Sequence, residues 1–339
     1  MRSEERPQYQ SRIGNSMQLI INTYGAYLRR RGELFQVKVD DVVSEVSARK
    51  VRSILITTAA TMSTDAIQLA IENNIDIIFL DKFGNPFGRV WHSKMGSTAQ
   101  IRRKQLEAVE KQLGLNIALG WVRKKFDNQI DLLERMRKRR TRLSSEITHG
   151  ISQLTPLCKQ LEGLKGSLGE RRNTILGIEG NAGRVYWKTV SLLLPEKYRF
   201  NGRSRNPAKN EFNCLLNYSY GVLYGTVERS CILAGLDPFV GFIHTDNYNK
   251  KSLVFDLIEN YRIWADESVI GLFASRQIKQ DMFDKLENGM TLNQDGKAVL
   301  MGRFSDFLAQ SIRHKGRNIK RRDSVQLDCH AFANKLIKE

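Results

Sequence analysis

The residues with the clearest chemistry in this chain lie in the stretch GFIHTDNYNKKSLVFDLIENYR, residues 241–262. His244 is followed 12 residues later by Asp256 and 15 residues later by Glu259. The two carboxylates lie in an apolar segment, so a helix there would place them on one face, one turn apart. An imidazole from the preceding loop could join them in a site for Mg²⁺ or Mn²⁺. Such an ion could catalyse attack on a phosphodiester.

A further carboxylate, Glu179, lies among small residues in LGIEGNAGRVYW, residues 176–187. Small side chains allow another helix or a substrate to approach the backbone closely. A glutamate in such surroundings differs from the solvated glutamate of an ordinary surface helix. On spacing alone, a surface histidine and a solvated glutamate stay open as alternatives for His244 and Glu179.

The composition limits the class of protein. The chain has 339 residues, which favours two domains, and 41% of them are hydrophobic, which argues against wholesale disorder. Its net charge of +18 favours a polyanionic partner, either nucleic acid or an anionic membrane surface. No apolar run is long enough to span a membrane, and residues 1–16 lack the apolar core of a secretory signal. We therefore expect a cytoplasmic protein that handles nucleic acid and has no membrane partner.

Two common cofactor signatures are missing from the sequence. The four cysteines show no paired spacing, which argues against structural zinc and disulfides and for buried, reduced thiols. A GxxxxGK loop followed by Ser or Thr does not occur, so ATP hydrolysis is not indicated.

The N-terminal region has the pattern of a small β-rich domain with one helix. Short segments rich in β-branched residues, separated by turn residues, predict strands at 17–22, 33–39, 53–58, 75–80 and 88–93. Residues 63–73 begin with a Ser/Thr cap and continue with helical apolar spacing, which predicts a helix.

After about residue 97 the pattern becomes helical and basic. Helices are predicted over 98–150, 171–194 and 209–235, and from about 252 to the end of the chain. A polar loop with five basic residues, 195–211, separates two of them. Trp121, Trp187 and Tyr220 have helical apolar spacing and are predicted to lie in the core rather than to stack on bases.

Runs of Lys and Arg recur through the helical region. RKRRTR (137–142), taken alone, favours a solvated helix face, whereas RHKGRNIKRR (313–322) has six Lys or Arg residues and no acid. Together the runs favour contacts to DNA phosphates that do not read the base sequence. The predicted DNA-binding residues are Arg102, Arg103, Lys125, Arg203, Arg205, Lys320, Arg321 and Arg322.

Taken together, these features resemble the CRISPR-associated spacer integrase family, the larger of the two core adaptation proteins. The resemblance covers about residues 17–339, and 234–262 is its most specific part. It rests on Glu179, Ala182 and Tyr186, on NxxLxxxY at 213–220, on AGLDPxxGFxH at 234–244, on DLxExxR at 256–262 and on KxxNQ at 125–129. This chain departs from the family's usual pattern at Asn210–Asn213 and at Asn247–Asn249, so details of substrate binding are expected to differ.

The resemblance implies an α+β chain with a small N-terminal, sandwich-like β-rich domain and a larger all-α C-terminal catalytic domain. We expect the β-rich domain at 17–95 and the catalytic domain at 96–339. Residues 1–16 are then an extension, or a linker of the kind that joins some family members to a reverse transcriptase.

The resemblance also implies the chemistry. Glu179, His244 and Glu259 match the family's Mg²⁺ or Mn²⁺ ligands, and Asp256, a nearby acid, is the fourth catalytic residue. The expected reaction is attack by the 3′-hydroxyl of a short double-stranded DNA, the spacer precursor, on a phosphodiester of the repeat array. The implied partners are a second copy of the chain and a small second adaptation protein.

Two other functions stay open at this stage. A structure-specific endonuclease would use the same metal site with water as the nucleophile. A non-catalytic architectural DNA binder would need only the basic runs, and it would have no use for acids in a site that faces DNA.

Overall fold

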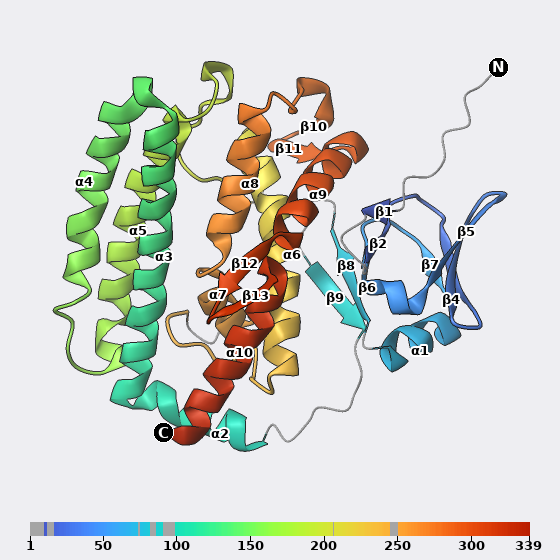
Figure 1. Cartoon of the computed structure of the whole chain (residues 1–339), viewed down its shortest axis with the longest axis horizontal. Helices are drawn as coiled ribbons and strands as arrows, with labels where there is room; N and C mark the ends of the chain where they lie inside the picture. The colour runs from blue at the N-terminus through green and yellow to red at the C-terminus, as the bar shows by residue number, and fades with distance from the viewer. Residues whose placement is uncertain are drawn as a thin grey trace.

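Strands and helices are segregated along the chain, with a β-rich N-terminal part and a largely helical C-terminal part (Figure 1). The computed structural model describes residues 10–11, 17–73, 75–81, 86–90, 99–205, 207–244 and 250–339. The predicted fold class is therefore confirmed, with two additions in the helical part that are given below. The predicted boundary near residue 95 stays a prediction.

A five-stranded sheet forms the centre of the N-terminal part. Its order is β1 (Gln10–Ser11), β2 (Met17–Ile21), β6 (Val51–Ile56), β8 (Asp76–Leu80) and β9 (Pro86–Val90). The three inner strands are parallel, and β1 and β9 run antiparallel to them at the edges. The predicted strand at 88–93 corresponds to β9, and its residues 91–93 lie outside the described part of the chain.

A second, four-stranded sheet packs on one face of the first. It consists of β3 (Tyr27–Arg31), β4 (Leu34–Val39), β5 (Val42–Ser47) and β7 (Thr61–Met62), in the order β5-β4-β3-β7. Helix α1 (Thr64–Glu72) packs against β3 and β8. The core between these elements includes Ile21, Leu28, Phe35, Ile54 and Leu69.

The other face of the five-stranded sheet packs on helices. Because side chains alternate along a strand, Ile54 and Ile56 of β6 enter the first core while Leu55 between them joins the core of the helical part. A buried ion pair crosses this contact: Arg89 lies 3.0 Å from Asp76 and donates to the carbonyl of Gly225 at 2.7 Å.

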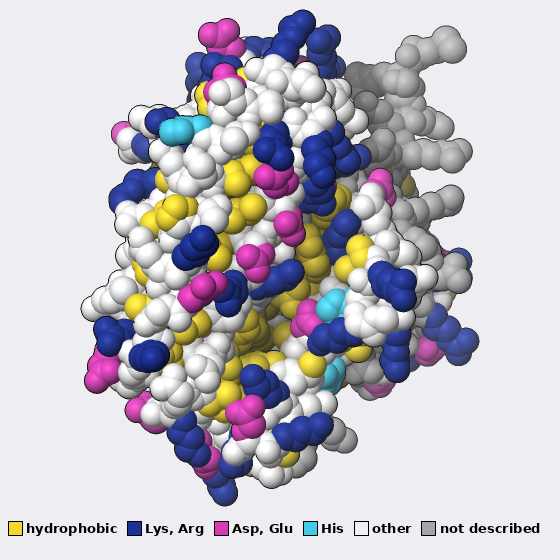
Figure 2. Space-filling model, turned by 60° about the vertical axis from the view of Figure 1, so that its left-hand side comes forward, with side chains coloured by type: hydrophobic (Ala, Val, Ile, Leu, Met, Phe, Trp, Pro, Cys, Tyr) yellow, Lys and Arg dark blue, Asp and Glu magenta, His cyan; other side chains and the backbone are white. Residues whose placement is uncertain are grey.

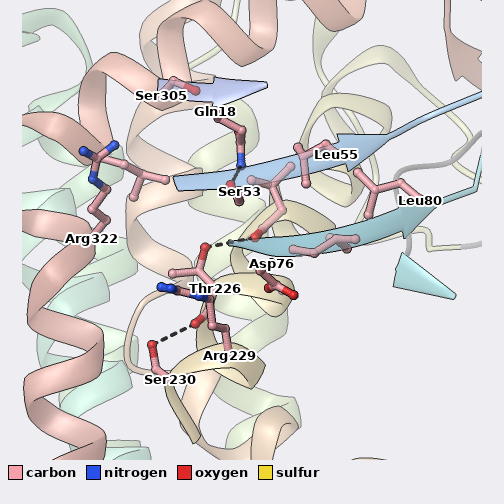
Figure 3. A pocket seen from close by; sticks show the side chains of 15 residues that line it. Gln18, Ser53, Leu55, Asp76, Leu80, Thr226, Arg229, Ser230, Ser305 and Arg322 are labelled. Carbon is pink, nitrogen blue, oxygen red and sulfur yellow. Dashed lines mark hydrogen bonds between the residues drawn. The ribbon is translucent and has the colours of Figure 1, made fainter. Parts of the chain in front are cut away.

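A small polar cavity of about 60 Å³ lies at the same contact (Figure 3). Gln18, Ser53 and Asp76 of the sheet line it, together with Arg229 and Arg322 of the helical part. A volume of this size holds a few water molecules and is too small for a nucleotide.

The helical part contains the following helices. They are α2 (Ala99–Glu110), α3 (Gln112–Arg139), α4 (Ser144–Gln160), α5 (Leu168–Leu192), α6 (Glu211–Leu233), α7 (Ser252–Ile258), α8 (Arg262–Ala274), α9 (Gln294–Ala309) and α10 (Arg321–Lys338). Helices α3, α4 and α5 lie side by side in a layer, and α6 is buried between α8, α10 and the sheet (Figure 1). Among the described residues, no helix is long and apolar enough to cross a membrane.

Two short hairpins interrupt the helices where continuous helix was predicted. They are β10 (Phe283–Leu286) with β11 (Gly289–Leu292), and β12 (Ser311–His314) with β13 (Arg317–Lys320). Lys315 and Gly316 have φ values of 48° and 81°, as a two-residue hairpin turn requires. The basic run at 313–322 is therefore a hairpin followed by the first turn of α10.

Candidate active site

A cleft of about 910 Å³ opens between α3, α5, α6, α7 and α8. Glu179, His244 and Glu259 all line it, although they are widely separated in the sequence. The face shown in Figure 2 is hollowed, and acidic, basic and histidine side chains gather around the hollow. The cleft is large enough for several nucleotide units.

Asp256 holds His244 in one orientation. Its Oδ1 atom accepts a hydrogen bond from Nδ1 of His244 at 2.6 Å and one from the His244 backbone N–H at 3.0 Å. Its Oδ2 atom accepts the backbone N–H groups of Phe242 and Ile243 at 2.6 Å and 3.1 Å. With Nδ1 as the donor, Nε2 of His244 keeps its lone pair for a ligand.

Asp256 does not reach the cleft. Its side chain is fully buried behind His244, whereas the His244 ring is 23% exposed. This position supports a positioning role for Asp256 rather than contact with the reacting atoms.

The turn that delivers His244 depends on a glycine. A Cβ atom at Gly241 would lie 2.5 Å from both the carbonyl oxygen of His244 and the Cβ atom of Ser252. Only a residue without a side chain fits there, which explains the glycine in the motif that precedes His244.

Lys125 of α3 brings Glu179 and Glu259 to one point. Its Nζ atom contacts Oε1 of Glu179 and lies 2.7 Å from Oε2 of Glu259. The other oxygen of Glu259, Oε1, contacts Arg262. The three side chains of Lys125, Glu179 and Glu259 are only 15%, 13% and 5% exposed, so little solvent screens their charges.

Glu259 and Lys125 are both charged at neutral pH. Burial opposes the ionised form of Glu259, but Arg262 and Lys125 outweigh it and lower the pKa of Glu259 to about 2. Burial likewise opposes the charged form of Lys125, yet Glu259 and Glu179 raise the pKa of Lys125 overall.

The residues present suit a hard divalent cation. Two carboxylates and one imidazole nitrogen are ligands that Mn²⁺ accepts, and an oxygen-rich set also suits Mg²⁺. The place where the two carboxylates meet already holds a positive charge, the ammonium of Lys125. Among the described residues, no group of three or more His, Cys, Asp or Glu side chains is arranged closely enough to hold a metal ion. The ligand set therefore stays a prediction.

Helix α6 and the loop before it form the basic wall of the cleft. Asn210 caps α6 by accepting the backbone N–H of Asn213 at 2.9 Å. Arg203 donates to Asn213 and, at 2.8 Å, to Asn217 of the same helix. Arg205 is exposed and also lines the cleft. The departure noted at Asn210–Asn213 therefore forms the cap of α6 and a support for Arg203.

Beneath this wall lies a carboxylate that sequence reasoning missed. Asp266 accepts hydrogen bonds from the hydroxyl groups of Tyr186 at 2.8 Å and Tyr220 at 2.6 Å. Burial raises the pKa of Asp266 to about 6, although the tyrosine and arginine neighbours oppose this rise. Asp266 follows Arg262 by one helical turn, and this spacing is the only feature of the sequence that could have pointed to Asp266 as a site residue.

The aromatic residues predicted to lie in the core, Trp121, Trp187 and Tyr220, are half-buried and pack against it, and two of them also line the cleft. Trp187 and Tyr220 are half-buried in its wall, and the Arg203 guanidinium lies 5.5 Å from the centre of each ring. Trp121 packs away from the cleft, with its ring 5.3 Å from those of Phe242 and Phe332.

The other predicted DNA-binding residues lie outside the cleft. Arg102 and Arg103 are on α2, where Arg102 lies 4.0 Å from Asp237. At the start of α10, Arg321 donates to the carbonyl of Phe307 and stacks on its ring, 3.9 Å from the ring centre. Lys320 is half-buried at the end of β13.

Arg322 is the buried residue among the predicted DNA contacts. The residue is 8% exposed and its side chain lines the small cavity against the sheet, a position that disfavours contact with a duplex (Figure 3). We therefore leave Arg322 out of the surface that we propose for DNA. The second departure, at Asn247–Asn249, lies outside the described residues.

Known proteins share this sequence pattern and this fold. A family model described as CRISPR associated protein Cas1 matches residues 19–306. The chain is 33% identical to CRISPR-associated endonuclease Cas1 1 of Archaeoglobus fulgidus, over 89% of this chain and 91% of that protein. A casposase bound to integration product has a TM-score of 0.81 at 24% identity, over 95% of this chain and 90% of that one. A chain of a Cas6-RT-Cas1–Cas2 complex has a TM-score of 0.79 at 21% identity, over 97% of this chain and 36% of that one.

The sequence identities of the two solved structures to this chain are low, so these matches show a shared fold and nothing more. The family match spans most of both parts of the chain, and the archaeal relative is similar over nearly its whole length. The chain thus belongs to the CRISPR-associated Cas1 family.

Proposed function

We propose that this Cas1 protein is a metal-dependent DNA integrase of CRISPR adaptation, which inserts short DNA duplexes into a repeat array. The observation that carries the proposal is the convergence of Glu179, Glu259 and His244 on one cleft with a basic wall. Acids that face a DNA-sized cleft are costly for a protein that only binds phosphates, since they repel its ligand. A catalytic site explains them.

The ligands of the divalent ion would be Glu179, Glu259 and Nε2 of His244. A bound Mg²⁺ or Mn²⁺ would activate the attacking hydroxyl and neutralise the charge that develops on the phosphate. Asp256 would keep the imidazole in the orientation and tautomer that bind a cation. Arg203 and Arg205 would hold phosphates along the wall of the cleft.

The proposed reaction exchanges one phosphodiester bond for another. The 3′-oxygen of the inserted duplex forms a bond to a phosphorus atom of the repeat strand. At the same time, the bond between that phosphorus and the 3′-oxygen of the preceding repeat nucleotide breaks. The attacking hydroxyl loses a proton, and the leaving oxygen gains one. Since the number of phosphodiester bonds is unchanged, the reaction needs no nucleotide hydrolysis.

The proposal includes partners. A casposase of the same fold is bound to an integration product, and another similar chain belongs to a Cas6-RT-Cas1–Cas2 complex. We infer that this chain binds double-stranded DNA, acts as a homodimer with a small second adaptation protein, and is compatible with a fused or associated reverse transcriptase. Because its substrate is DNA, we place its action in the cytoplasm.

A structure-specific endonuclease is the second candidate, and the name of the archaeal relative favours it. It would use the same cleft and ligands, with water in place of the 3′-hydroxyl. The nucleophile therefore separates the two candidates.

The test is a joining assay with a plasmid that carries the repeat, the small partner protein and a short labelled duplex. A duplex with free 3′-hydroxyl ends should become covalently joined in Mn²⁺, and one with dideoxy ends should not. Glu179→Gln and Glu259→Gln should abolish joining and leave duplex binding nearly intact. Glu146→Gln, an exposed position on α4, is the matched control and should keep full activity.

Metal-dependent nicking without a joined product would contradict the integrase and support the endonuclease. Binding without either reaction would support an architectural role, and Glu179, His244 and Glu259 would then be structural residues.

A further inference from the structure

The ammonium of Lys125 occupies the place where two proposed metal ligands meet. It contacts Oε1 of Glu179 and lies 2.7 Å from Oε2 of Glu259. The remaining oxygen of Glu259 is engaged by Arg262, which fixes the direction in which Oε2 points. Lys125 comes from α3 and the two acids from α5 and the end of α7, so one charge connects three elements.

This charge has a structural task. Two ionised carboxylates that converge in a site with little solvent repel each other strongly. The ammonium between them offsets that repulsion and supplies hydrogen bonds to both. Without a cation at this point, the middle of α5 and the C-terminal end of α7 would be pushed apart.

A divalent ion between the two acids would need Oε2 of Glu259, the atom that Lys125 contacts, because Arg262 engages Oε1. Mg²⁺ and Mn²⁺ bind oxygens at a little over 2 Å, and an ammonium cannot share that space. Binding of the metal ion therefore requires the amine of Lys125 to leave, and the flexible four-carbon stem of lysine allows this movement.

We propose that Lys125 is a resident cation, which holds Glu179 and Glu259 together in the metal-free protein and competes with the divalent ion for them. This inference rests on the proposed function, because it takes the two acids to be metal ligands. It adds that the protein carries its own occupant of the site, so that metal affinity is weaker than the ligands alone would provide. The displaced ammonium would then be free to meet a phosphate in the cleft.

The test measures Mn²⁺ binding by isothermal titration calorimetry and melting temperature in EDTA, so neither readout depends on activity. Lys125→Met, which keeps the volume of the stem and removes the charge, should bind Mn²⁺ roughly tenfold or more tightly than the parent protein. In EDTA it should melt several degrees lower, and saturating Mn²⁺ should restore most of the loss. Lys124→Met is the matched control: it lies next along α3, is exposed, and should match the parent protein in both measurements.

A second variant guards against loss of folding. Lys125→Gln retains a hydrogen-bond donor without the charge and should shift Mn²⁺ affinity in the same direction. Either variant could fold only when Mn²⁺ is present. A cooperative melting transition that appears on addition of Mn²⁺ would then show that the metal ion replaces the missing ammonium.

Two results would overturn the inference in distinguishable ways. Unchanged or weaker Mn²⁺ binding by both variants, with normal binding by the parent protein, would contradict the resident cation and leave the metal site in place. No Mn²⁺ binding by the parent protein would contradict the metal site itself, and with it the proposed function.

Discussion

The Nδ1 atom of His244 lies 2.6 Å from Oδ1 of Asp256, and the same carboxylate accepts the backbone N–H groups of residues 242–244. One buried acid thus fixes both the path of the loop and the orientation of its imidazole. This arrangement separates the two residues by function: His244 faces the cleft, and Asp256 supports it from behind.

Asp256→Asn is predicted to damage the fold as well as the reaction. An amide has only one acceptor oxygen, so its NH₂ group would face backbone N–H donors and leave them unsatisfied. We expect a loss of about 1–3 kcal/mol in the free energy of unfolding. His244→Ala should instead abolish joining and leave the melting temperature nearly unchanged, because its ring is partly exposed. Equal melting temperatures for the two variants would contradict the positioning role.

Gly241→Ala is predicted to displace His244. The added methyl group would lie 2.5 Å from the carbonyl oxygen of His244 and from Cβ of Ser252, and neither atom belongs to a flexible side-chain end. We expect overpacking to reduce the free energy of unfolding by about 1–3 kcal/mol, together with a loss of joining. Gly302→Ala in α9, where the described residues leave open space, should be neutral or stabilising by up to about 1 kcal/mol. Full activity of the Gly241 variant would show that the loop tolerates a different path.

Gly180→Ala tests whether substrate passes over α5. Among the described residues, no atom lies within 4 Å of a Cβ placed at Gly180 or Gly177, and Gly180 lines the cleft whereas Gly177 does not. Both substitutions should stabilise the helix by up to about 1 kcal/mol. Only Gly180→Ala should weaken duplex binding, by about tenfold if the methyl group meets the DNA. Equal affinities in a fluorescence anisotropy titration would place the DNA away from this face of α5.

Much of the fold could be predicted because its signals are local. The strands β2, β4, β6 and β8 and the helix α1 match predictions from β-branched runs and a Ser/Thr cap. Strand β3 was missed because YLRRR, with three consecutive arginines, has the composition of a surface loop. The hairpins in the helical part were missed because their turn residues were read as part of basic or polar helices.

The site was predictable only in part, because only some of its residues lie in compact local motifs. The motifs that contain His244 and Glu259 are compact in sequence, so spacing and family resemblance found them. The meeting of Lys125 with Glu179 and Glu259 depends on the packing of α3, α5 and α7, which local patterns do not encode. Lys125 was therefore predicted as a DNA contact, whereas the structure places its amine between two acids.

Arg205→Ala is predicted to reduce the salt dependence of DNA binding. Arg205 is exposed and lines the cleft, so its guanidinium is available to a phosphate. Loss of one phosphate contact should lower the slope of log K against log salt concentration by about 0.9. Arg199→Ala, an exposed position nearby that does not line the cleft, should leave the slope unchanged. Equal slopes for the two variants would move the DNA-binding surface elsewhere, for example to Lys320 or α2.

Asp266→Asn is predicted to change how stability depends on pH. Burial raises the pKa of Asp266 from 3.8 to about 6, so the folded state binds this proton more tightly than the unfolded state does. The stabilisation from the protonated form is complete below the unfolded pKa and is lost as the pH rises through about 6, a change on the order of 3 kcal/mol at most. The amide cannot ionise, so the stability of Asp266→Asn relative to the parent protein should rise between pH 4 and pH 8.

The test is whether the stability of Asp266→Asn relative to the parent protein rises with pH. The relative stability at any one pH does not decide it. The amide also alters the hydrogen bonds from Tyr186 and Tyr220, and that effect shifts the variant by the same amount at every pH. Asp127→Asn, exposed on α3, is the matched control and should differ from the parent protein equally across the range. Urea unfolding at several pH values provides the measurement. If the free-energy difference for Asp266→Asn stays constant, the carboxylate is ionised throughout, held by Arg203 and Arg262, and the tyrosines then solvate a permanent buried charge beneath the cleft.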